Sequence, residues 1–324
     1  MFRRCVEGVA SAAVSTAFSR PVSKSVVRVA TGAVAAVLAL LLAWTARAEP
    51  PVPLLWKGSD ADSSLYLLGS FHLLSAADYP LSGDVDAAFA DAPTVLFELS
   101  PEEMESPALA ALMAQAATRT RPGSLEQDLG PALWAQLQRY AQANGLALEP
   151  LARLEPWFVG LSVGLLEMGK LGLDPALGLD RHFMQAAARA GKATAGLELA
   201  QEQIAVLAGM DLDEQRQLLA DALDHADQGP ARSRALHGAW RAGDAESLWD
   251  GMAAEMKRDY PALYRRINIE RNDAWLARLE RSLAGTDNVL VVVGALHLLG
   301  EDGLVEKLRA QGYRVERICS ACAH

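Results

Sequence analysis

The chain has 324 residues and a formal charge of −10, with 51% of its residues hydrophobic and 22% charged. This composition is typical of a globular protein and excludes a largely disordered chain, and the length suggests one or two domains. The net negative charge argues against nucleic acid or anionic lipid as a partner.

Residues 1–48 differ from the rest of the chain. They carry six basic side chains and one acid, and an apolar run of 16 residues (29–44) precedes Ala-Arg-Ala at 46–48. This order is typical of a secretory signal peptide. We expect cleavage after Ala48, which leaves a mature domain over 49–324 with a charge of −15, periplasmic or secreted. The alternative is an uncleaved anchor, the one case in which a membrane would be a partner, although a span typically needs about 20 residues.

The mature chain begins with an extended, Pro-rich segment at 49–56. The apolar stretch 63–70 then predicts a buried strand, and 94–100 predicts a second strand that ends at Glu98. A helix from about 84 to 90, stopped before a proline, separates the two strands. A strand, a helix and a strand in this order favour a parallel pair with a right-handed crossover.

The middle of the chain is mainly helical in pattern from residue 101 onward, with one short strand candidate at 193–198. The chain closes with a strand at 288–294, a helix at 301–312 and a strand at 313–318. The strand–helix–strand units at the two ends can share one sheet only if the chain, after the helical middle, returns to the sheet formed by the first strands. The sequence therefore predicts a single α/β domain in which a large helical insertion divides the strands of one central sheet.

One pattern occurs twice, as LYLLGSFHLL at 65–74 and LVVVGALHLLG at 290–300. In each copy a glycine ends an apolar strand and a histidine follows three residues later, which gives Gly69 with His72 and Gly294 with His297. Ligands of open α/β sheets bind beyond the carboxyl ends of the strands. If the two strands lie side by side, the histidines meet there, and Glu98 reaches the same edge. Two imidazoles and a carboxylate resemble a divalent-metal site.

The alternative for these residues is structural. A histidine after an apolar strand is often only a hydrogen-bonded part of the core, and the Gly-x-x-His pattern alone is a weak signal. Glu98 could also cap the helix that follows it.

Four further polar residues are candidates for the same cleft. Asp180 in GLD and Glu198 in AGLE could each supply a second carboxylate, or could cap a helix. Arg271 and Asn272 in ERNDAW could orient a substrate carbonyl or a carboxylate, or could lie on an exposed helix face.

The remaining histidines carry less weight. His182 lies beside Asp180 and could line the cleft or only its wall. His225 and His237 have the pattern of solvated helix positions, and His324 ends the chain. The tryptophans fall within apolar helix faces and are expected in the core.

The mature chain keeps two cysteines, Cys319 and Cys322, in the sequence CSAC. In an exported protein such a pair most simply forms a structural disulfide. A zinc knuckle would need two more ligands, and a thioredoxin-type site would need a helix start after a strand.

The chain resembles the TraB/GumN group, which is related to PrgY and to the Tiki metalloproteases. The resemblance covers residues 54–318 and includes VLFELS, EQIAVLAG and AWRAGD between the two repeat copies. The family pattern of two Gly-x-x-His motifs and a strand-end glutamate falls on Gly69, His72, Glu98, Gly294 and His297.

The resemblance implies a fold related to the erythromycin-esterase and ChaN folds. Its likeness to Tiki implies metal-dependent hydrolysis of a peptide or protein substrate, with manganese or cobalt as the ion and zinc as a further option. On this basis His72, His297 and Glu98 are metal ligands, and Glu98, Glu198, Arg271 and Asn272 form the catalytic set. The alternatives are a periplasmic haem- or metal-binding protein and a regulatory module without catalysis.

Overall fold

The computed structural model describes residues 49–60 and 62–322, and the residues from Pro50 onward form one compact unit. The predicted signal segment 1–48 and His324 lie outside the described residues. The described part of the chain contains a six-stranded mixed sheet in the order β4-β3-β5-β2-β1-β6. This arrangement confirms the predicted single α/β domain. The strands are β1 (Leu55–Ser59), β2 (Ser64–Ser70), β3 (Thr94–Phe97), β4 (Ala193–Gly196), β5 (Val289–Gly294) and β6 (Arg314–Arg317).

Strand β5, from the C-terminal end of the chain, lies between β2 and β3 and is parallel to both. The expected direct pairing of the strands at 63–70 and 94–100 is therefore wrong, because the crossover between them leaves room for one more strand. That strand is apolar along its whole length, as a strand with two parallel neighbours in a sheet core must be. The extended segment at the start of the mature chain also contains a strand, β1, which pairs antiparallel with β2 and β6.

The longer predicted helical stretches are broken into shorter helices. Pro107 begins a new helix capped by Ser106, so the stretch 101–117 forms two helices. Two π-turns, η3 (Asp250–Ala254) and η4 (Arg265–Ile269), interrupt the helices of the last third.

The helices that contact strands or share the sheet core are α2 (Gly83–Asp91), α3 (Pro101–Met104), α8 (Leu179–Ala190), α15 (Glu270–Leu283) and α16 (Leu304–Ala310), while α9 (Ala200–Ala208) packs on α4. The others are α4 (Pro107–Ala117), α5 (Leu125–Ala143), α6 (Leu148–Leu151), α7 (Pro156–Gly169), α10 (Leu212–Asp227), α11 (Pro230–Ala242), α12 (Ala245–Trp249), α13 (Glu255–Asp259) and α14 (Pro261–Tyr264). Short 3₁₀ turns are η1 (Ala76–Asp78), η2 (Pro175–Leu177), η5 (Ala295–Leu298) and η6 (Ser320–Cys322). No helix within 49–60 or 62–322 is long and apolar enough to span a membrane.

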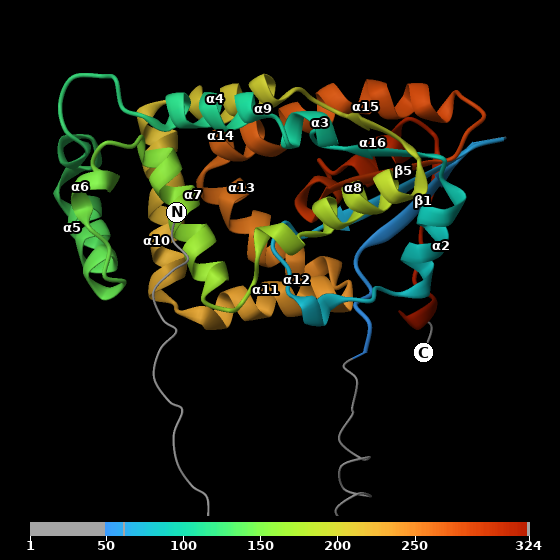
Figure 1. Ribbon diagram of the computed structural model, residues 1–324, viewed down its shortest axis with the longest axis horizontal. Coiled ribbons are helices and arrows are strands. Elements are labelled where there is room, and N and C mark those ends of the chain that lie inside the picture. The colour runs from blue at the N-terminus through green and yellow to red at the C-terminus, as the bar shows by residue number, and fades with distance from the viewer. Residues whose placement is uncertain (1–48, 61, 323–324) are drawn as a thin grey trace, which may run out of the picture. The chain divides into compact units, whose positions relative to one another are not determined.

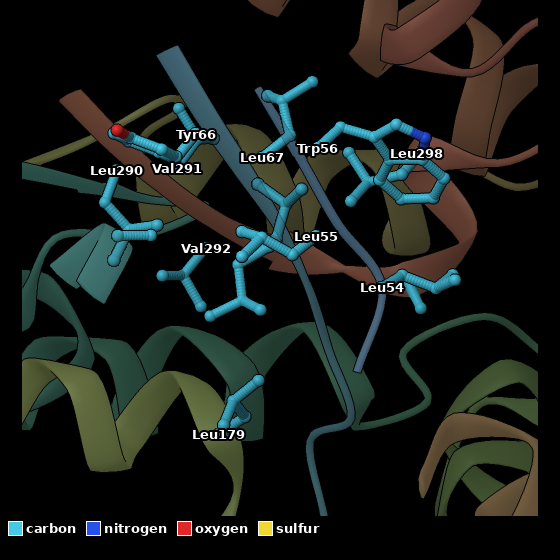
Figure 2. Packing of buried hydrophobic residues seen from close by; sticks show 14 of the residues in the cluster. Leu54, Leu55, Trp56, Tyr66, Leu67, Leu179, Leu290, Val291, Val292 and Leu298 are labelled. Atoms are coloured by element: carbon cyan, nitrogen blue, oxygen red, sulfur yellow. The ribbon is translucent and has the colours of Figure 1, made fainter. Parts of the chain in front are cut away.

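The main hydrophobic core lies around the sheet. Helix α8 packs on β4 and β5, and α15 packs on β2 (Figure 1). Side chains of β1, β2 and β5 meet Leu179 of α8 and Leu298 of η5 in this core (Figure 2). Full burial of a side chain such as leucine contributes about 2 kcal/mol, so this cluster holds the strand ends in place. Trp157, Trp240 and Trp275 are buried as expected.

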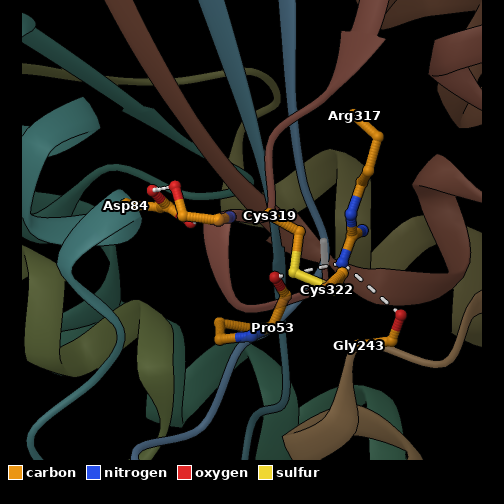
Figure 3. Close-up of a disulfide and its surroundings, with 7 residues drawn as sticks. Pro53, Asp84, Gly243, Arg317, Cys319 and Cys322 are labelled. Carbon is orange, nitrogen blue, oxygen red and sulfur yellow. Dashed lines mark hydrogen bonds between the residues drawn. A yellow bond between two sulfur atoms is a disulfide. The ribbon is translucent and has the colours of Figure 1, made fainter. Parts of the chain in front are cut away.

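The two cysteines form the predicted disulfide, Cys319–Cys322, just after β6 (Figure 3). Between them, the backbone N–H and hydroxyl of Ser320 donate to Asp84 of α2, at 2.6 and 2.7 Å. Arg317 donates to the carbonyl oxygens of Pro53 and Gly243. These contacts hold the last described residues against the segment before β1, helix α2 and the end of α11.

A buried carboxylate, Asp78, joins η1 to α11. It accepts hydrogen bonds from Ser75 and Arg241, and its Oδ1 lies 3.0 Å from Nε2 of His237. The expectation that His237 is solvated is wrong, because its ring packs between this carboxylate and Trp240. Burial alone would raise the pKa of Asp78, but its hydrogen bonds outweigh burial and hold the pKa below its ordinary value.

We expect Asp78→Asn to lower the free energy of unfolding at pH 7 by about 3 kcal/mol, because it breaks a buried charge pair. A carboxyl with a depressed pKa stabilises the fold above its unfolded-state pKa, and this contribution is lost as the pH falls. The difference in unfolding free energy between wild type and variant should therefore shrink as the pH falls below 3.8, the ordinary pKa of an aspartate. Urea unfolding at pH 7 and pH 3 measures it. Asp86→Asn, at an exposed position of α2, is the control.

Candidate active site

Three polar side chains converge beyond the carboxyl ends of β2, β3 and β5. His72 follows β2 by two residues, Glu98 follows β3 directly, and His297 lies in η5 just after β5. Nε2 of His72 is 3.9 Å from Oε1 of Glu98, and Nε2 of His297 is 4.0 Å from the same oxygen. The pairing of β2 with β5 thus brings together two histidines that are 225 positions apart in the sequence.

The two glycines of the repeat have different roles. The N–H of Gly294 donates to Oε1 of Glu98 at 2.7 Å. A Cβ at Gly294 would lie 3.2 Å from that oxygen and 3.2 Å from Nε2 of His72, so glycine leaves the space in which these groups meet. A Cβ at Gly69 would instead lie 3.2 Å from Cβ of Leu54 and 3.3 Å from Ala295. Gly69 therefore serves packing.

Asp180 fixes the ring of His72. Oδ1 of Asp180 lies 3.2 Å from Nδ1 of His72 and accepts a hydrogen bond from Ser70 at 3.0 Å. Gly178 permits this approach, because a Cβ there would lie 2.2 Å from the carbonyl oxygen of His72. Burial opposes the charged imidazole, but the Asp180 hydrogen bond and the charges of Asp180 and Glu98 outweigh it and raise the pKa of His72 to about 9. The side chain keeps 54% exposure, so it faces the cleft.

Asn272 fixes the ring of His297 in a buried position. The amide of Asn272 donates to the carbonyl oxygens of Asp302 and His297, so its oxygen faces Nδ1 of His297 at 2.8 Å as an acceptor. The proton is thereby assigned to Nδ1, and Nε2 keeps a lone pair. Burial, together with the charge of Arg271, lowers the pKa of His297 to about 3. His297 is neutral near pH 7.

Arg271 is the charge centre of the site. Its Nη2 donates to Glu98 and to Glu198, both at 2.6 Å, and its Nε donates to Glu198 at 3.1 Å. Its Nη1 lies 3.0 Å from Nε2 of His297, and its guanidinium stacks over Trp275. Burial disfavours the charged form of both groups. The charge of Arg271 nevertheless holds the pKa of Glu98 below its ordinary value, and the charge of Glu98 holds the pKa of Arg271 above its ordinary value.

The helix-capping alternative is wrong for Glu98 and Glu198, and the alternative of an exposed helix face is wrong for Arg271 and Asn272. Ser100, and not Glu98, caps α3, and Glu198 precedes the N-cap residue of α9. Asn272 is fully buried, and the side chain of Arg271 is only 13% exposed. The π-turn η4 ends just before α15, and its carbonyl at Ile267 accepts from Arg271. Such π-segments are frequent at functional sites.

His182 lies outside the cluster, in the wall behind it. Its ring stacks on Tyr79 at 4.5 Å and meets the edge of Phe183 at 5.2 Å. Burial lowers its pKa. His225 pairs with Asp221 on α10, which carries it away from the cleft.

Two cavities adjoin the cluster. The first, here called the His72 cavity, has a volume of about 240 Å³ and is lined by His72, Glu98, Asp180 and apolar side chains. The second, the Arg271 groove, has a volume of about 510 Å³ between α9 and α15.

Sequence reasoning missed several neighbours of the cluster. Gln203 donates to Glu198 at 2.9 Å, and Arg181 and Met184 of α8 line the His72 cavity. The glycine before Asp180 was visible in the sequence as GLD, but no motif distinguished Gln203, Arg181 or Met184 from ordinary helix residues.

The arrangement is not closed around a metal ion. Within residues 49–60 and 62–322, no three or more His, Cys, Asp or Glu side chains already stand as a ligand group. The cluster offers two fixed imidazoles, two glutamates and a guanidinium between them. Such groups can hold a cation, move a proton and stabilise a developing negative charge.

Comparison with known proteins places the chain in a family. It is 27% identical over 244 residues to "Uncharacterized protein YbaP" of Escherichia coli (strain K12) and equally to that of Shigella flexneri, covering 75% of this chain and 87% of either relative. No solved structure matches, so the likeness to erythromycin esterase and ChaN stays a prediction. The sequence model of the TraB/PrgY/gumN family matches residues 54–317, a span that includes the whole cluster. The chain therefore belongs to the TraB/PrgY/gumN family.

Proposed function

We propose that the chain is a metal-dependent hydrolase, with a peptide bond as its target and His72, His297 and Glu98 as the residues that hold one divalent cation. The observation that carries this proposal is the convergence of two imidazole Nε2 atoms on one carboxylate oxygen, at 3.9 and 4.0 Å. Two imidazoles and one carboxylate form a donor set that suits manganese, cobalt, iron or zinc. The likeness to the Tiki metalloproteases favours the peptide bond among the bonds that such a site could hydrolyse.

The donor set fits a cation after a small adjustment. With metal–ligand bonds of about 2.1 Å, neighbouring donors of a tetrahedral site lie about 3.4 Å apart, so each Nε2 atom needs to approach Oε1 of Glu98 by about half an ångström. His72, whose pKa is raised to about 9, must also release its proton when the cation binds. Asp180 and Asn272 already hold the outer nitrogens of the two histidines, the support that metal-binding histidines typically have. Nη1 of Arg271 occupies the lone pair of His297, so Arg271 and a cation compete for that nitrogen.

Bound there, a divalent cation would polarise a substrate carbonyl and make a water molecule more acidic. The chain's own residues supply the rest. Glu198, which is not among the proposed cation ligands, takes a proton from the attacking water molecule as general base. Arg271 lies between the two glutamates and His297 and stabilises the negative charge that develops on the carbonyl oxygen. Gln203 holds Glu198 in place through the hydrogen bond to its Oε1.

We also propose that the mature chain works in the periplasm or outside the cell. The disulfide between Cys319 and Cys322 supports this proposal, because disulfides persist in oxidising compartments. The acidic mature chain, with its charge of −15, favours a peptide or protein substrate over nucleic acid.

The first experiment measures metal binding. Titration of the metal-free protein with Mn²⁺, Co²⁺ and Zn²⁺ in a calorimeter should give one site per chain for at least one of the ions. His72→Ala and His297→Ala should each weaken binding at least tenfold, since each removes a ligand. His225→Ala, on α10, should leave it unchanged. A wild-type protein that binds none of the three ions contradicts the proposal.

Arg271→Gln tests the competition between Arg271 and a cation. Without the guanidinium, two buried glutamates lose their partner, so the metal-free protein should lose about 3 kcal/mol of unfolding free energy. Addition of Mn²⁺ should raise the melting temperature of this variant more than that of the wild type. Arg278→Gln is the matched control, since Arg278 lies on the same helix and bonds only a backbone carbonyl at the groove. An equal rise in melting temperature for Arg271→Gln and the wild type on addition of Mn²⁺ would refute the competition.

Glu98→Gln tests hydrolysis directly. A peptide library incubated with the Mn²⁺-loaded protein and analysed by mass spectrometry should show cleavage that a chelator stops. The variant should cleave at least 100-fold more slowly, because it removes the charged ligand. Glu102→Gln, at an exposed position of α3, should retain full activity. Cleavage that persists in Glu98→Gln would rule out this role.

A further inference from the structure

The His72 cavity is lined by apolar and polar side chains together. Phe97 and Leu99 of the segment after β3, Met104 of α3 and Met184 of α8 line it, together with Pro175 of η2. His72 and Glu98, the two residues proposed to hold the cation together with His297, also line it. A group that enters this cavity is therefore attached to a substrate atom that lies beside those two side chains.

The size and chemistry of the cavity suit one side chain. Its volume of about 240 Å³ lies below the roughly 300–1,000 Å³ of pockets that take a whole small molecule or cofactor. The methionines are unbranched and adapt to the shape of an apolar partner. Burial of such a partner is favourable by about 25 cal/mol per Å² of apolar surface.

The charges around the cavity oppose a cationic side chain. Glu98 is committed to Arg271 and to the N–H of Gly294, and Asp180 is committed to His72 and Ser70. Arg181 lines the same cavity, and within the part of the chain that the structure describes it has no recorded hydrogen bond or ion pair. A lysine or arginine of the substrate would meet the positive charge of this guanidinium, and the two carboxylates of the lining are already paired, Glu98 with Arg271 and Asp180 with His72.

We propose that the His72 cavity is the specificity subsite of the enzyme. It takes an unbranched or γ-branched apolar side chain, such as methionine or leucine, of the substrate residue next to the bond that is cleaved. Arg181 excludes lysine and arginine from it. This assignment rests on the proposed peptide hydrolysis and adds the class of peptide.

Binding, and not cleavage, tests the subsite. The probes are acetyl-Gly-Gly-X-Gly-Gly-amide peptides in which a ketomethylene group replaces the amide after X, with X as leucine, methionine, alanine or lysine. Calorimetry on the full wild-type protein should show leucine and methionine probes bound at least tenfold more tightly than alanine. The lysine probe should bind no more tightly than alanine.

Two variants separate charge from size. Arg181→Glu should tighten binding of the lysine probe at least tenfold and leave the leucine probe within twofold, with Arg181→Gln as a milder form should the charge reversal not fold. Met104→Trp should weaken the leucine probe at least tenfold and spare the alanine probe, because it fills the cavity. Glu102→Gln on the same helix as Met104 is the matched control.

The outcomes separate this subsite from the hydrolase proposal. Equal binding of all four probes, no binding of any, or no response to Arg181→Glu would each overturn the subsite. The expected binding pattern without any metal-dependent cleavage would support the subsite and refute the hydrolase. Cleavage of peptides with a preference for lysine or arginine would support the hydrolase and refute the subsite.

Discussion

The parallel pairing of β2 with β5 is the contact on which the rest of the structure depends. It joins strands from opposite ends of the compact unit, and the register sets Ser70 against Gly294. Both strands consequently end at the same edge of the sheet, and their histidines follow at similar distances beyond it. The long helical insertion between them is free to supply the walls, because the sheet itself already fixes the two imidazoles. The repeated sequence thus reflects two halves of one site.

Charge balance organises the site as strongly as strand geometry does. One guanidinium, Arg271, serves two glutamates that arrive from β3 and from the loop before α9. Buried carboxylates this close would repel each other without it, so the arginine stabilises the fold around the site. The surroundings shift the pKa values of the two histidines in opposite directions. Carboxylates near His72 favour its charged form, whereas burial keeps His297 neutral.

Sequence patterns predicted the strands at 63–70 and 288–294 well, because continuous apolar runs ended by glycine have few other solutions. They also predicted which strand ends carry polar groups. They could not show that β5 separates β2 from β3, since strand order depends on how the whole insertion packs. The partners of Arg271 were equally hidden: its two glutamates lie 173 and 73 residues upstream, and no local pattern links them. No local pattern distinguished Gln203 or Arg181 either, because only the fold brings them beside the cluster.

The central place of β5 has a consequence for how the protein is made. Until β5 has been synthesised, β2 and β3 lack the strand that lies between them in the sheet, and each leaves an unpaired edge there. Such edges invite pairing with other chains. Holding factors that shield these edges until β5 emerges would suit this topology, and a chain that stopped before residue 289 would lack both β5 and His297.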